Sequence, residues 1–494
     1  VGGGRFDLLV PLQAEEKVLE YSRCLSKWLL EKFQGELAVL IVTEPARRAD
    51  FADARHLYQT LETKLEFQKQ RKWGDLLSIE QMALPRGEVW HICKVCQLTP
   101  MEDSGQICDL CQMHEIIGKK LPHTQYLAYC YIEPAAKGEL IAFPSDSPIA
   151  ARYIVFATYA SELEQLPPNS RVIKLNQTKD FILPRVASSF RFLANFAPIA
   201  GKDWEGEGEE KVTKGNVLHF EAIAKLSNGA ERIGVLKADV DLLGLMIGEG
   251  LTTDEADHSL SQGVKPTLSR VAALSRMLEL FFAGHLNRIC HEISLEWASR
   301  NPDRAAKAKG IFYILYSGGD DLFVVGPWDW VLELAERIER EFADYTGCNP
   351  SLTLSAGYIQ VKPRYPIQKA ADLVDEAEKV AKGQRNQICA FNVPMSWNEF
   401  RELLRLSRDW SGAIERREIP SGFIYDLGSL FRQHSDPEGR LRPLWTPQLY
   451  YTLARRLKKE AKAKYQQGIF EAIRSRKVLF PISITSLTIR ERSR

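Results

Sequence analysis

The chain has 494 residues, 45% of them hydrophobic, and its 65 Lys and Arg residues nearly balance 64 Asp and Glu residues. This length predicts several domains, and the hydrophobic fraction excludes a largely disordered chain. The balanced charge argues against a protein that coats nucleic acid through general positive charge. No apolar run is long enough to span a bilayer, and no charged-then-apolar leader opens the chain. We therefore expect a cytoplasmic protein whose nine cysteines are reduced thiols or metal ligands.

The chain opens, without Met, on a glycine-rich turn at 2–4 that leads into a predicted strand ending at Pro11, and we expect it to be part of a longer protein. The pattern then predicts a helix over 15–33, a stop at Gly35 and a strand over 37–42. The same order recurs later, as a Gly-Gly pair, an apolar run to Pro, a helix, a glycine and a strand, over 318–359. Chance matching is the alternative, but three ordered matches predict two related α/β domains, of which only the second carries acids.

Between these two segments lie two Cys-x-x-Cys pairs, eleven residues apart. They are Cys93, Cys96, Cys108 and Cys111. Four thiolates at this spacing predict a closed tetrahedral zinc site with a structural role, and the alternative is two pairs of buried or redox-active thiols. The neighbouring histidines are expected to be bystanders: His91, His114 and His123. The remaining cysteines have no partner spacing and are expected in cores: Cys24, Cys130, Cys290, Cys348 and Cys389.

The strongest chemical signal combines two acidic segments. A predicted strand over 234–241 ends in Asp239 and Asp241, which share one face because strand side chains alternate. A helix over 268–289 then leads to a strand over 311–316 and to a hairpin with the sequence Ser-Gly-Gly-Asp-Asp at 317–321. If the two strands are neighbours, their carboxylates would hold two Mg²⁺ or Mn²⁺ ions for phosphoryl chemistry. The alternative for each segment alone is an exposed turn or a helix cap.

Further segments are less specific. Lys382 and Arg385 are candidate triphosphate clamps at the end of a helix, although a solvated helix end is the alternative. Residues 204–210 read as a linker and 254–266 as a loop near the acids. Helices are predicted over 397–408 and 447–474, and the second is rich in Arg and Lys. That basic helix is a candidate contact for RNA or a partner subunit, or simply a solvated face.

The order of these motifs resembles the palm fold of polymerases and of GGDEF-type nucleotide cyclases. The fuller pattern is similar to the large subunit of type III CRISPR–Cas complexes, particularly the Csm type. The matching segments are Phe220–Ala224, Leu236–Gly244, Leu274–Arg276 and Phe281-Phe282. The resemblance implies an α+β multidomain protein with two ferredoxin-like palm domains, a zinc-binding insertion and a helical C-terminal domain. The expected boundaries are 1–80 and 131–203 for the first, degenerate palm, 81–130 for the zinc module, 204–400 for the catalytic palm and 401–494 for the helical domain.

The resemblance also implies roles for residues at the matching positions. Asp239, Asp320 and Asp321 would be the catalytic, metal-binding acids, with Asp241 as a further candidate. Nucleotide-binding positions would be Ser317, Gly318, Gly319, Lys382 and Arg385. Gly383 does not stand directly before Arg385, as it does in cyclase-like sequences, and this weakens the clamp assignment.

The activity that the resemblance implies is synthesis of cyclic oligoadenylates from ATP, activated by target RNA. The implied partners are the other complex subunits, guide RNA and target RNA, with single-stranded DNA as a further candidate and no membrane. Relatives of this kind often carry an amino-terminal HD nuclease, but no adjacent His-Asp pair occurs here, so we expect that domain to be lacking and assign no DNA cleavage to this chain. Two alternatives are a stand-alone cyclic-dinucleotide cyclase and a non-catalytic scaffold that binds guide RNA.

Overall fold

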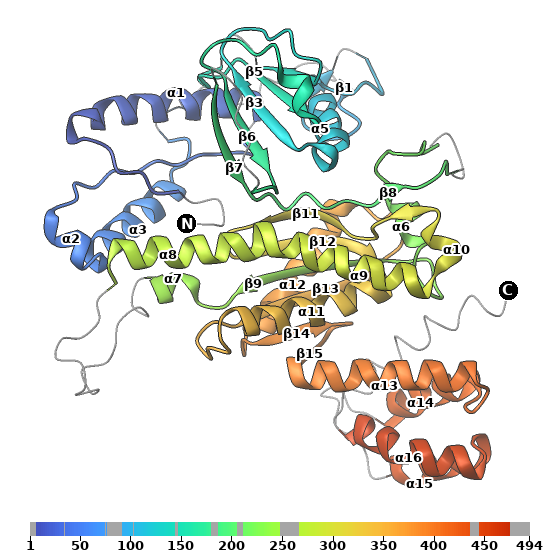
Figure 1. Cartoon of the computed structure of the whole chain (residues 1–494). Coiled ribbons are helices and arrows are strands. Elements are labelled where there is room, and N and C mark those ends of the chain that lie inside the picture. The colour runs from blue at the N-terminus through green and yellow to red at the C-terminus, as the bar shows by residue number, and fades with distance from the viewer. Residues whose placement is uncertain are drawn as a thin grey trace. The chain divides into compact units, whose positions relative to one another are not determined.

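The computed structural model describes residues 6–33, 35–74, 76, 91–101, 103–143, 147–178, 186–204, 211–247, 266–434 and 444–474. The chain divides into two units, each with its own sheet (Figure 1). Unit 1 comprises Val1–Leu193 and Leu242–Leu280, and unit 2 comprises Ala194–Asp241 and Phe281–Arg494. Within the described residues, every helix is too short or too polar to cross a membrane.

Unit 1 starts with helices. They are η1 (Leu12–Ala14), α1 (Glu15–Phe33), α2 (Arg48–Ala52) and α3 (Arg55–Lys69). The helix predicted over 15–33 is confirmed, and Gly35 follows it with φ +89°. The strands predicted on either side of it are wrong, because the described residues between 6 and 76 contain no strand. Leu8, Leu9 and Leu37 are exposed, so an apolar run is present but no neighbouring strand pairs with it.

The rest of unit 1 holds the cysteine-rich segment and a sheet. The cysteine-rich segment contains β1 (His91–Ile92), β2 (Pro100–Met101), α5 (Asp109–Lys120) and η2 (Leu121–His123). The sheet has the order β4-β5-β3-β6-β7 and is antiparallel except between β6 and β7. Its strands and short helix are β3 (Tyr126–Cys130), β4 (Glu139–Ala142), β5 (Tyr153–Ala157), η3 (Ala160–Leu163), β6 (Arg171–Leu175) and β7 (Ala187–Arg191).

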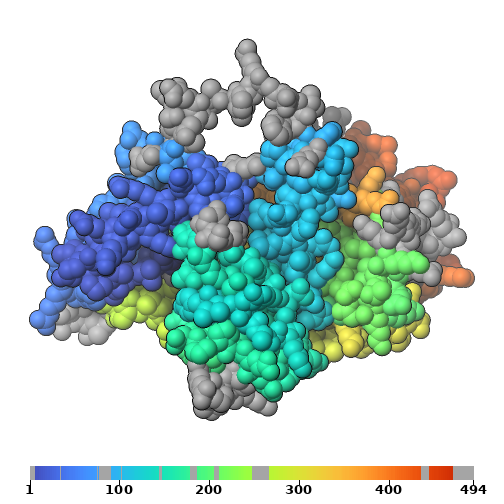
Figure 2. Space-filling view, turned by 90° about the horizontal axis from the view of Figure 1, so that it is seen from above, coloured from blue at the N-terminus to red at the C-terminus, as the bar shows by residue number. Residues whose placement is uncertain are grey.

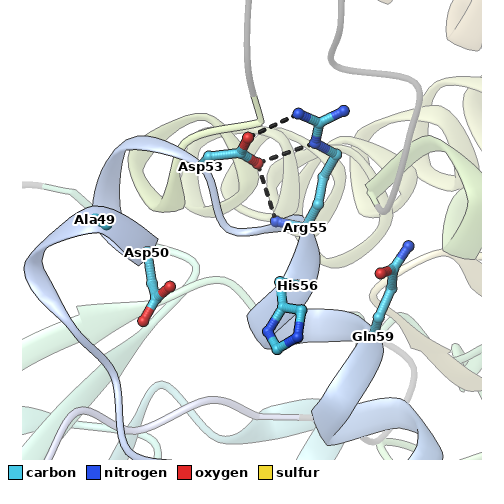
Figure 3. Close-up of a pocket in the computed structure, with 6 residues that line it drawn as sticks. All are labelled: Ala49, Asp50, Asp53, Arg55, His56 and Gln59. Carbon is cyan, nitrogen blue, oxygen red and sulfur yellow. Dashed lines mark hydrogen bonds and ion pairs between the residues drawn. The ribbon is translucent and has the colours of Figure 1, made fainter.

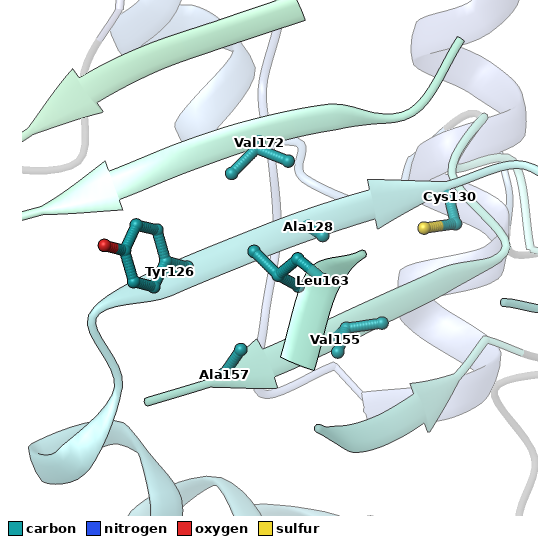
Figure 4. Packing of buried hydrophobic residues seen from close by; sticks show 7 residues of the cluster. All are labelled: Tyr126, Ala128, Cys130, Val155, Ala157, Leu163 and Val172. Atoms are coloured by element: carbon teal, nitrogen blue, oxygen red, sulfur yellow. The ribbon is translucent and has the colours of Figure 1, made fainter. Parts of the chain in front are cut away.

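The core of this sheet is a small apolar cluster. Alternate residues of β3, β5 and β6 point to one face, where Leu163 of η3 covers them (Figure 4). The buried members are Tyr126, Ala128, Cys130, Val155, Ala157, Leu163 and Val172. In the space-filling view the helices of residues 6–76 (blue) adjoin the surface of this sheet (teal) (Figure 2). Unit 1 therefore has its own core, but its described strands do not repeat the predicted strand–helix–strand pattern.

A shallow hollow lies between α2 and α3 of unit 1. Its volume is about 390 Å³, and its lining residues are Ala49, Asp50, Asp53, Arg55, His56 and Gln59 (Figure 3). The Arg55 guanidinium is paired with Asp53 at 2.7 Å, so the main cation of the hollow already has a partner. The predicted acids belong to unit 2.

Unit 2 contains a six-stranded sheet with the order β11-β12-β9-β13-β14-β15. Its strands are β9 (Ile233–Val240), β11 (Tyr313–Gly318), β12 (Asp321–Pro327), β13 (Leu354–Val361), β14 (Gln387–Ala390) and β15 (Val393–Ser396). The helices between them are α9 (Leu286–Arg300), α11 (Trp328–Tyr345) and α12 (Ile367–Lys382). The order β9-α9-β11-β12-α11-β13 is the ferredoxin-like βαββαβ arrangement that the sequence predicts for the second palm.

Glycines in this sheet let helices approach both faces closely. A Cβ on Gly357 of β13 would lie 2.5 Å from the backbone of Val374 and Glu378, which belong to α12. A Cβ on Gly234 of β9 would lie 2.9 Å from Trp328, at the start of α11. Because Gly234 and Lys237 point to opposite faces of β9, α11 covers one face and α12 covers the other.

Several helices lie in the chain between β9 and β11. They are α7 (Leu243–Leu245), α8 (Leu268–Glu279), the π-helix η5 (Leu280–His285), α9 and α10 (Pro302–Ala305). The helix predicted over 268–289 is therefore present but is interrupted by the π-helix. Short elements flank the sheet: β8 (Ile199–Ala200), α6 (Phe220–Ala224) and β10 (Ala308–Lys309).

Four helices follow the sheet: α13 (Trp397–Glu415), α14 (Ser421–His434), α15 (Trp445–Arg456) and α16 (Lys459–Arg474). The first of them runs across the boundary expected at 400/401. The single helix predicted over 447–474 is wrong, because Leu457 leaves the helical conformation and separates α15 from α16. Residues 205–210 of the predicted linker and 254–265 of the predicted loop lie outside the described residues. Trp204 itself is packed, since its indole N–H donates to the carbonyl of Lys307.

Candidate active site and metal centre

Three carboxylates meet at one end of the unit 2 sheet. Asp239 of β9 lies directly opposite Asp321 of β12 in the antiparallel register, so both side chains share one face. Gly318 pairs with Asp321 in the β11–β12 hairpin, which leaves Gly319 and Asp320 as the turn. Gly319 has φ +72°, a conformation that glycine adopts without strain. The hairpin and β9 therefore bring together the acids that are 80 residues apart in the sequence.

Burial and crowding disfavour negative charge on these acids. Burial raises the pKa of Asp239 to about 6, the Lys382 ammonium opposes this, and neighbouring Asp320 adds to it. Burial likewise raises the pKa values of Asp320 and Asp321 above their ordinary range. Asp321 Oδ1 is buried and has no hydrogen-bond partner among the described residues. Several carboxylates close together, one with an oxygen free of hydrogen bonds, provide the oxygen ligands that divalent cations prefer.

A chain of alternating charges connects the acids to α12. The Lys382 ammonium donates to the Asp239 carboxylate and also lies 2.8 Å from Glu378 Oε1. On its other side, Glu378 Oε2 lies 3.2 Å from Lys237 Nζ, which in turn is 2.6 Å from Asp375 Oδ1. Hydrogen bonds to Asp239 and Glu378 raise the pKa of Lys382 even though partial burial opposes this. Lys382 therefore stands beside the acids as a cation.

Asp241 has a different environment from Asp239. Its Oδ1 accepts from the Ser355 hydroxyl at 2.7 Å, and its Oδ2 accepts from the Thr353 hydroxyl at 2.8 Å and from the Asn386 N–H at 2.9 Å. The side chain is 4% exposed and follows the last residue of β9. Its oxygens are thus committed to protein donors, and the geometry favours a structural role over the predicted metal-binding one.

The remaining predicted site residues lie around the hairpin and at the end of α12. The Ser317 hydroxyl donates to the carbonyl of Phe282 at 2.9 Å, so it anchors the hairpin to the π-helix. Among the described residues, a Cβ on Gly318 would meet the Tyr316 hydroxyl alone, at 4.0 Å, so their atoms leave this position open. Arg385 is exposed and follows the helix with φ +60°. Of the two candidate clamps, only Lys382 is placed against the acids.

Three residues at this site were not predicted from the sequence. Glu378 and Lys237 hold Lys382 and α12 in place, and Tyr316 lies at the hairpin, where burial and the nearby Asp321 raise its pKa. Two of them left a detectable signal. Glu378 precedes Lys382 by four residues on a helix, and Lys237 precedes Asp239 by two residues on a strand.

The four predicted cysteines form a second, separate centre in unit 1. The sulfur atoms of Cys93, Cys96, Cys108 and Cys111 lie within 4.8 Å of one another. The Cys108 N–H donates to Cys93 Sγ and lowers the pKa of that thiol to about 6, whereas burial and the other sulfurs raise the pKa of Cys111 to about 12. The pKa of Cys93 is thus lowered and that of Cys111 raised, as expected where several thiols that can each become negative lie close together. The predicted clustering is confirmed, and the four-sulfur set fits zinc.

Two expectations about other cysteines are wrong. Cys24 and Cys348 are exposed rather than in a core, because α1 presents its polar face at Cys24 and Cys348 follows the end of α11. Cys130, Cys290 and Cys389 are buried as predicted.

Comparison with known proteins gives matches over both units. A family model described as the second palm domain of Cas10/Cmr2 matches residues 232–389, and one described as Csm1 subunit domain B matches residues 1–86. The first match contains the three acids and Lys382, whereas the second covers the segment that we assigned to a partial palm.

Several curated proteins named CRISPR system single-strand-specific deoxyribonuclease Cas10/Csm1 (subtype III-A) are similar in sequence. The one from Methanocaldococcus jannaschii is 34% identical over 205 residues, which is 38% of this chain and 24% of that protein. The one from Mycobacterium tuberculosis is 27% identical over 467 residues, which is 88% of this chain and 53% of that protein. The chain spans about half the length of the relatives that it matches over most of its own length.

The fold is similar to that of solved Csm1 structures. An apo Csm1–Csm4 cassette superposes with a TM-score of 0.65 at 21% identity, covering 97% of this chain and 61% of that one. A cassette in complex with one ATP gives a TM-score of 0.64 at 21% identity, covering 97% and 60%. Together, the two family models and the relatives make this chain similar over both units to Cas10/Csm1 proteins of subtype III-A, and the solved structures show that it shares the Csm1 fold.

Proposed function

We propose that unit 2 is the nucleotidyltransferase centre of a type III CRISPR complex and joins ATP into cyclic oligoadenylates when target RNA is bound. The observation that carries this proposal is the register of the sheet. It sets Asp239 opposite Asp321, with Asp320 on the adjoining turn, on one face of a ferredoxin-like palm. Acids on two adjacent strands and on the turn beside them can hold the two divalent ions that two-metal phosphoryl transfer uses.

In this proposal the carboxylates of Asp239, Asp320 and Asp321 would hold two Mg²⁺ or Mn²⁺ ions. Such ions activate a 3′-hydroxyl and neutralise charge on the phosphates when they are bound. The unpartnered Oδ1 of Asp321 and the raised pKa values of all three acids favour this assignment.

The protein's own groups would position the nucleotide. Gly318 keeps the hairpin tip open, so phosphate oxygens can approach the backbone, and Gly319 allows the tight turn. Lys382 presents a cation at the same place, where it would pair with the triphosphate. Arg385, Ser317 and Asp241 were also expected to bind nucleotide or metal. For Ser317 and Asp241 the hydrogen bonds to protein groups favour anchoring instead.

The solved relatives support the substrate and product classes. Their Csm1–Csm4 cassettes were crystallised with ATP, pppApApA, cA3 and cA4. By analogy we propose a Csm4-like subunit as a direct partner of this chain, and guide and target RNA as components of the working complex. We also propose zinc as the ion of the four-cysteine centre, where it would hold the surrounding loops together.

The proposal is tested by assembling the chain with its partner subunits and guide RNA, and adding ATP, Mg²⁺ or Mn²⁺, and target RNA. Products are separated by mass, and a matched complex carries Asp320→Ala and Asp321→Ala. Cyclic adenylates that require both target RNA and the acid pair are expected. An intact complex that binds target RNA but makes no adenylate product would contradict the proposal and leave the scaffold function. Products that form without target RNA would instead favour a stand-alone cyclase.

A further inference from the structure

Glu378 is a buried carboxylate held between two lysines. Its side chain is 6% exposed, with Lys382 Nζ 2.8 Å from one oxygen and Lys237 Nζ 3.2 Å from the other. Its backbone is fixed as well, because Gly357 lets α12 lie directly on β13 at this residue. Glu378 therefore cannot turn toward solvent without breaking both ion pairs.

The two lysines differ in what lies beyond them. Lys237 also pairs with Asp375 and is 26% exposed, whereas Lys382 reaches the Asp239 carboxylate and is 37% exposed. A long lysine side chain loses rotamer freedom when it is held in one place, and a fixed anion one helical turn away reduces the number of positions it can occupy. Lys237 places a second positive charge against Glu378, 3.2 Å from the oxygen that does not contact Lys382.

We infer that Glu378 is a positioning residue, which holds the ammonium group of Lys382 at the acid cluster so that it receives the phosphates of the incoming nucleotide. Within the described residues, Glu378 forms ion pairs with Lys237 and Lys382 and none with the three acids, so it acts through Lys382. This inference rests on the proposed function, because it takes the acid cluster to be a nucleotide site.

The arrangement explains why two anions contact Lys382. Under the proposed function, Asp239 is a metal-binding carboxylate, and its charge is shared when cations are present. Both ion pairs of Glu378 are with lysines, so its contact with Lys382 does not depend on what Asp239 binds. Lys382 would then stay in place when the nucleotide binds. Because the side chain is already ordered in the free protein, binding would not have to include the entropy cost of ordering it.

The test is a double-mutant cycle in the assembled complex with guide and target RNA, using wild type, Glu378→Gln, Lys382→Ala and the double variant. We measure kcat and KM for ATP, together with binding of the α,β-methylene analogue of ATP by calorimetry. Loss of one buried charged contact is expected to raise KM and the analogue's Kd about tenfold in Glu378→Gln. In the Lys382→Ala background the same change should alter KM less than about twofold, because its effect passes through the lysine.

Two controls separate positioning from general stability. Glu339→Gln changes another part-buried glutamate of unit 2, which pairs with Arg401 on α13, and should leave KM unchanged. Glu378→Asp keeps a carboxylate near Lys237 but moves it farther from Lys382, because its side chain is shorter. This variant replaces Glu378→Gln in the test if Glu378→Gln does not fold. It should raise KM with a smaller loss of thermal stability.

Additive effects of Glu378→Gln and Lys382→Ala on KM and on analogue binding would overturn the inference. So would a fall in melting temperature with KM and Kd unchanged. If the wild-type complex makes no product yet binds the analogue, the proposed function fails, and analogue binding by the variants still decides the role of Glu378.

Discussion

The backbone N–H of Asn386 donates to Asp241 Oδ2 over 2.9 Å, across 145 residues of sequence. This bond holds the turn after α12 against the end of β9. Arg385 and Asn386 in that turn have φ values of 60° and 49°, which are costly for residues other than glycine. A buried carboxylate with three donors therefore stabilises the turn that follows Lys382.

Asp241→Ala is expected to reduce the free energy of unfolding by about 3 kcal/mol, because it leaves the buried hydroxyl of Ser355 and the part-buried hydroxyl of Thr353 without their acceptor. Urea unfolding of the purified chain measures the change. Asp372→Ala, at an exposed position on α12, is the matched control and should stay within about 0.5 kcal/mol of wild type. Equal stability of the two variants would show that Asp241 does not stabilise the turn that follows α12.

Gly357→Ala should destabilise unit 2 by about 2 kcal/mol, because the new methyl group would lie 2.5 Å from backbone atoms of α12 and the helix must move off β13. Thermal and urea unfolding measure this. Gly422→Ala on α14 is the control, since a Cβ there meets nothing within 4 Å and alanine is the better helix former. A loss of stability in Gly422→Ala as large as that in Gly357→Ala would contradict the steric explanation.

Asp329 should make stability depend on pH. Its Oδ1 is buried without a partner among the described residues, and burial raises the pKa of this carboxyl to about 7. Because the folded-state pKa lies above the unfolded one, the folded state binds more protons between about pH 4 and 7. The contribution of this group to stability is therefore present below about pH 4 and is lost as pH rises toward 7, by at most about 1.4 kcal/mol per pH unit.

The Asp329→Asn variant keeps an acceptor for Asn228 but cannot ionise. Melting temperatures of wild type and variant, measured between pH 5 and 8, should diverge as pH rises, with the variant gaining relative to wild type up to about pH 7. Parallel curves would show that Asp329 does not titrate in this range.

Removal of the metal should affect the four-cysteine centre and leave the palm fold in place. Cys93→Ser is expected to abolish the zinc content measured by elemental analysis and to increase proteolysis around residues 91–120, because structural zinc contributes directly to local folding. Cys24→Ser, which changes an exposed cysteine outside the cluster, should retain zinc. Undiminished zinc in Cys93→Ser would exclude the predicted ligand set.

The catalytic palm was predictable from sequence because its signals are local. Asp239 lies near the end of an apolar strand, and the glycine pair directly before Asp320 and Asp321 marks a hairpin that follows another apolar strand. The direct pairing of Asp239 with Asp321 was expected only in outline, since register depends on which strands become neighbours.

The wrong predictions share one physical cause. Residues 37–42 have strand-like composition, but a strand forms only where a partner supplies hydrogen bonds, and sequence periodicity does not report partners. In the same way, Asp239 and Asp241 were both candidate metal ligands from the sequence, although Asp241 follows the end of β9 and accepts from Ser355 of β13 and from Thr353 just before it. The role of Glu378 depends on α12 packing on β9, a contact between segments about 140 residues apart.

Ser396 is both the last residue of β15 and the N-cap of α13. Its hydroxyl accepts a hydrogen bond from the Glu399 N–H, and its own N–H donates to the Glu399 carboxylate. Trp397 then donates its indole N–H to Leu354 within the sheet. No residue separates strand from helix, so a protease finds no exposed linker at this junction. Truncation at 396 would strip Trp397 and Phe400 from the sheet, and the sheet and α13 should be retained together when expression boundaries are chosen.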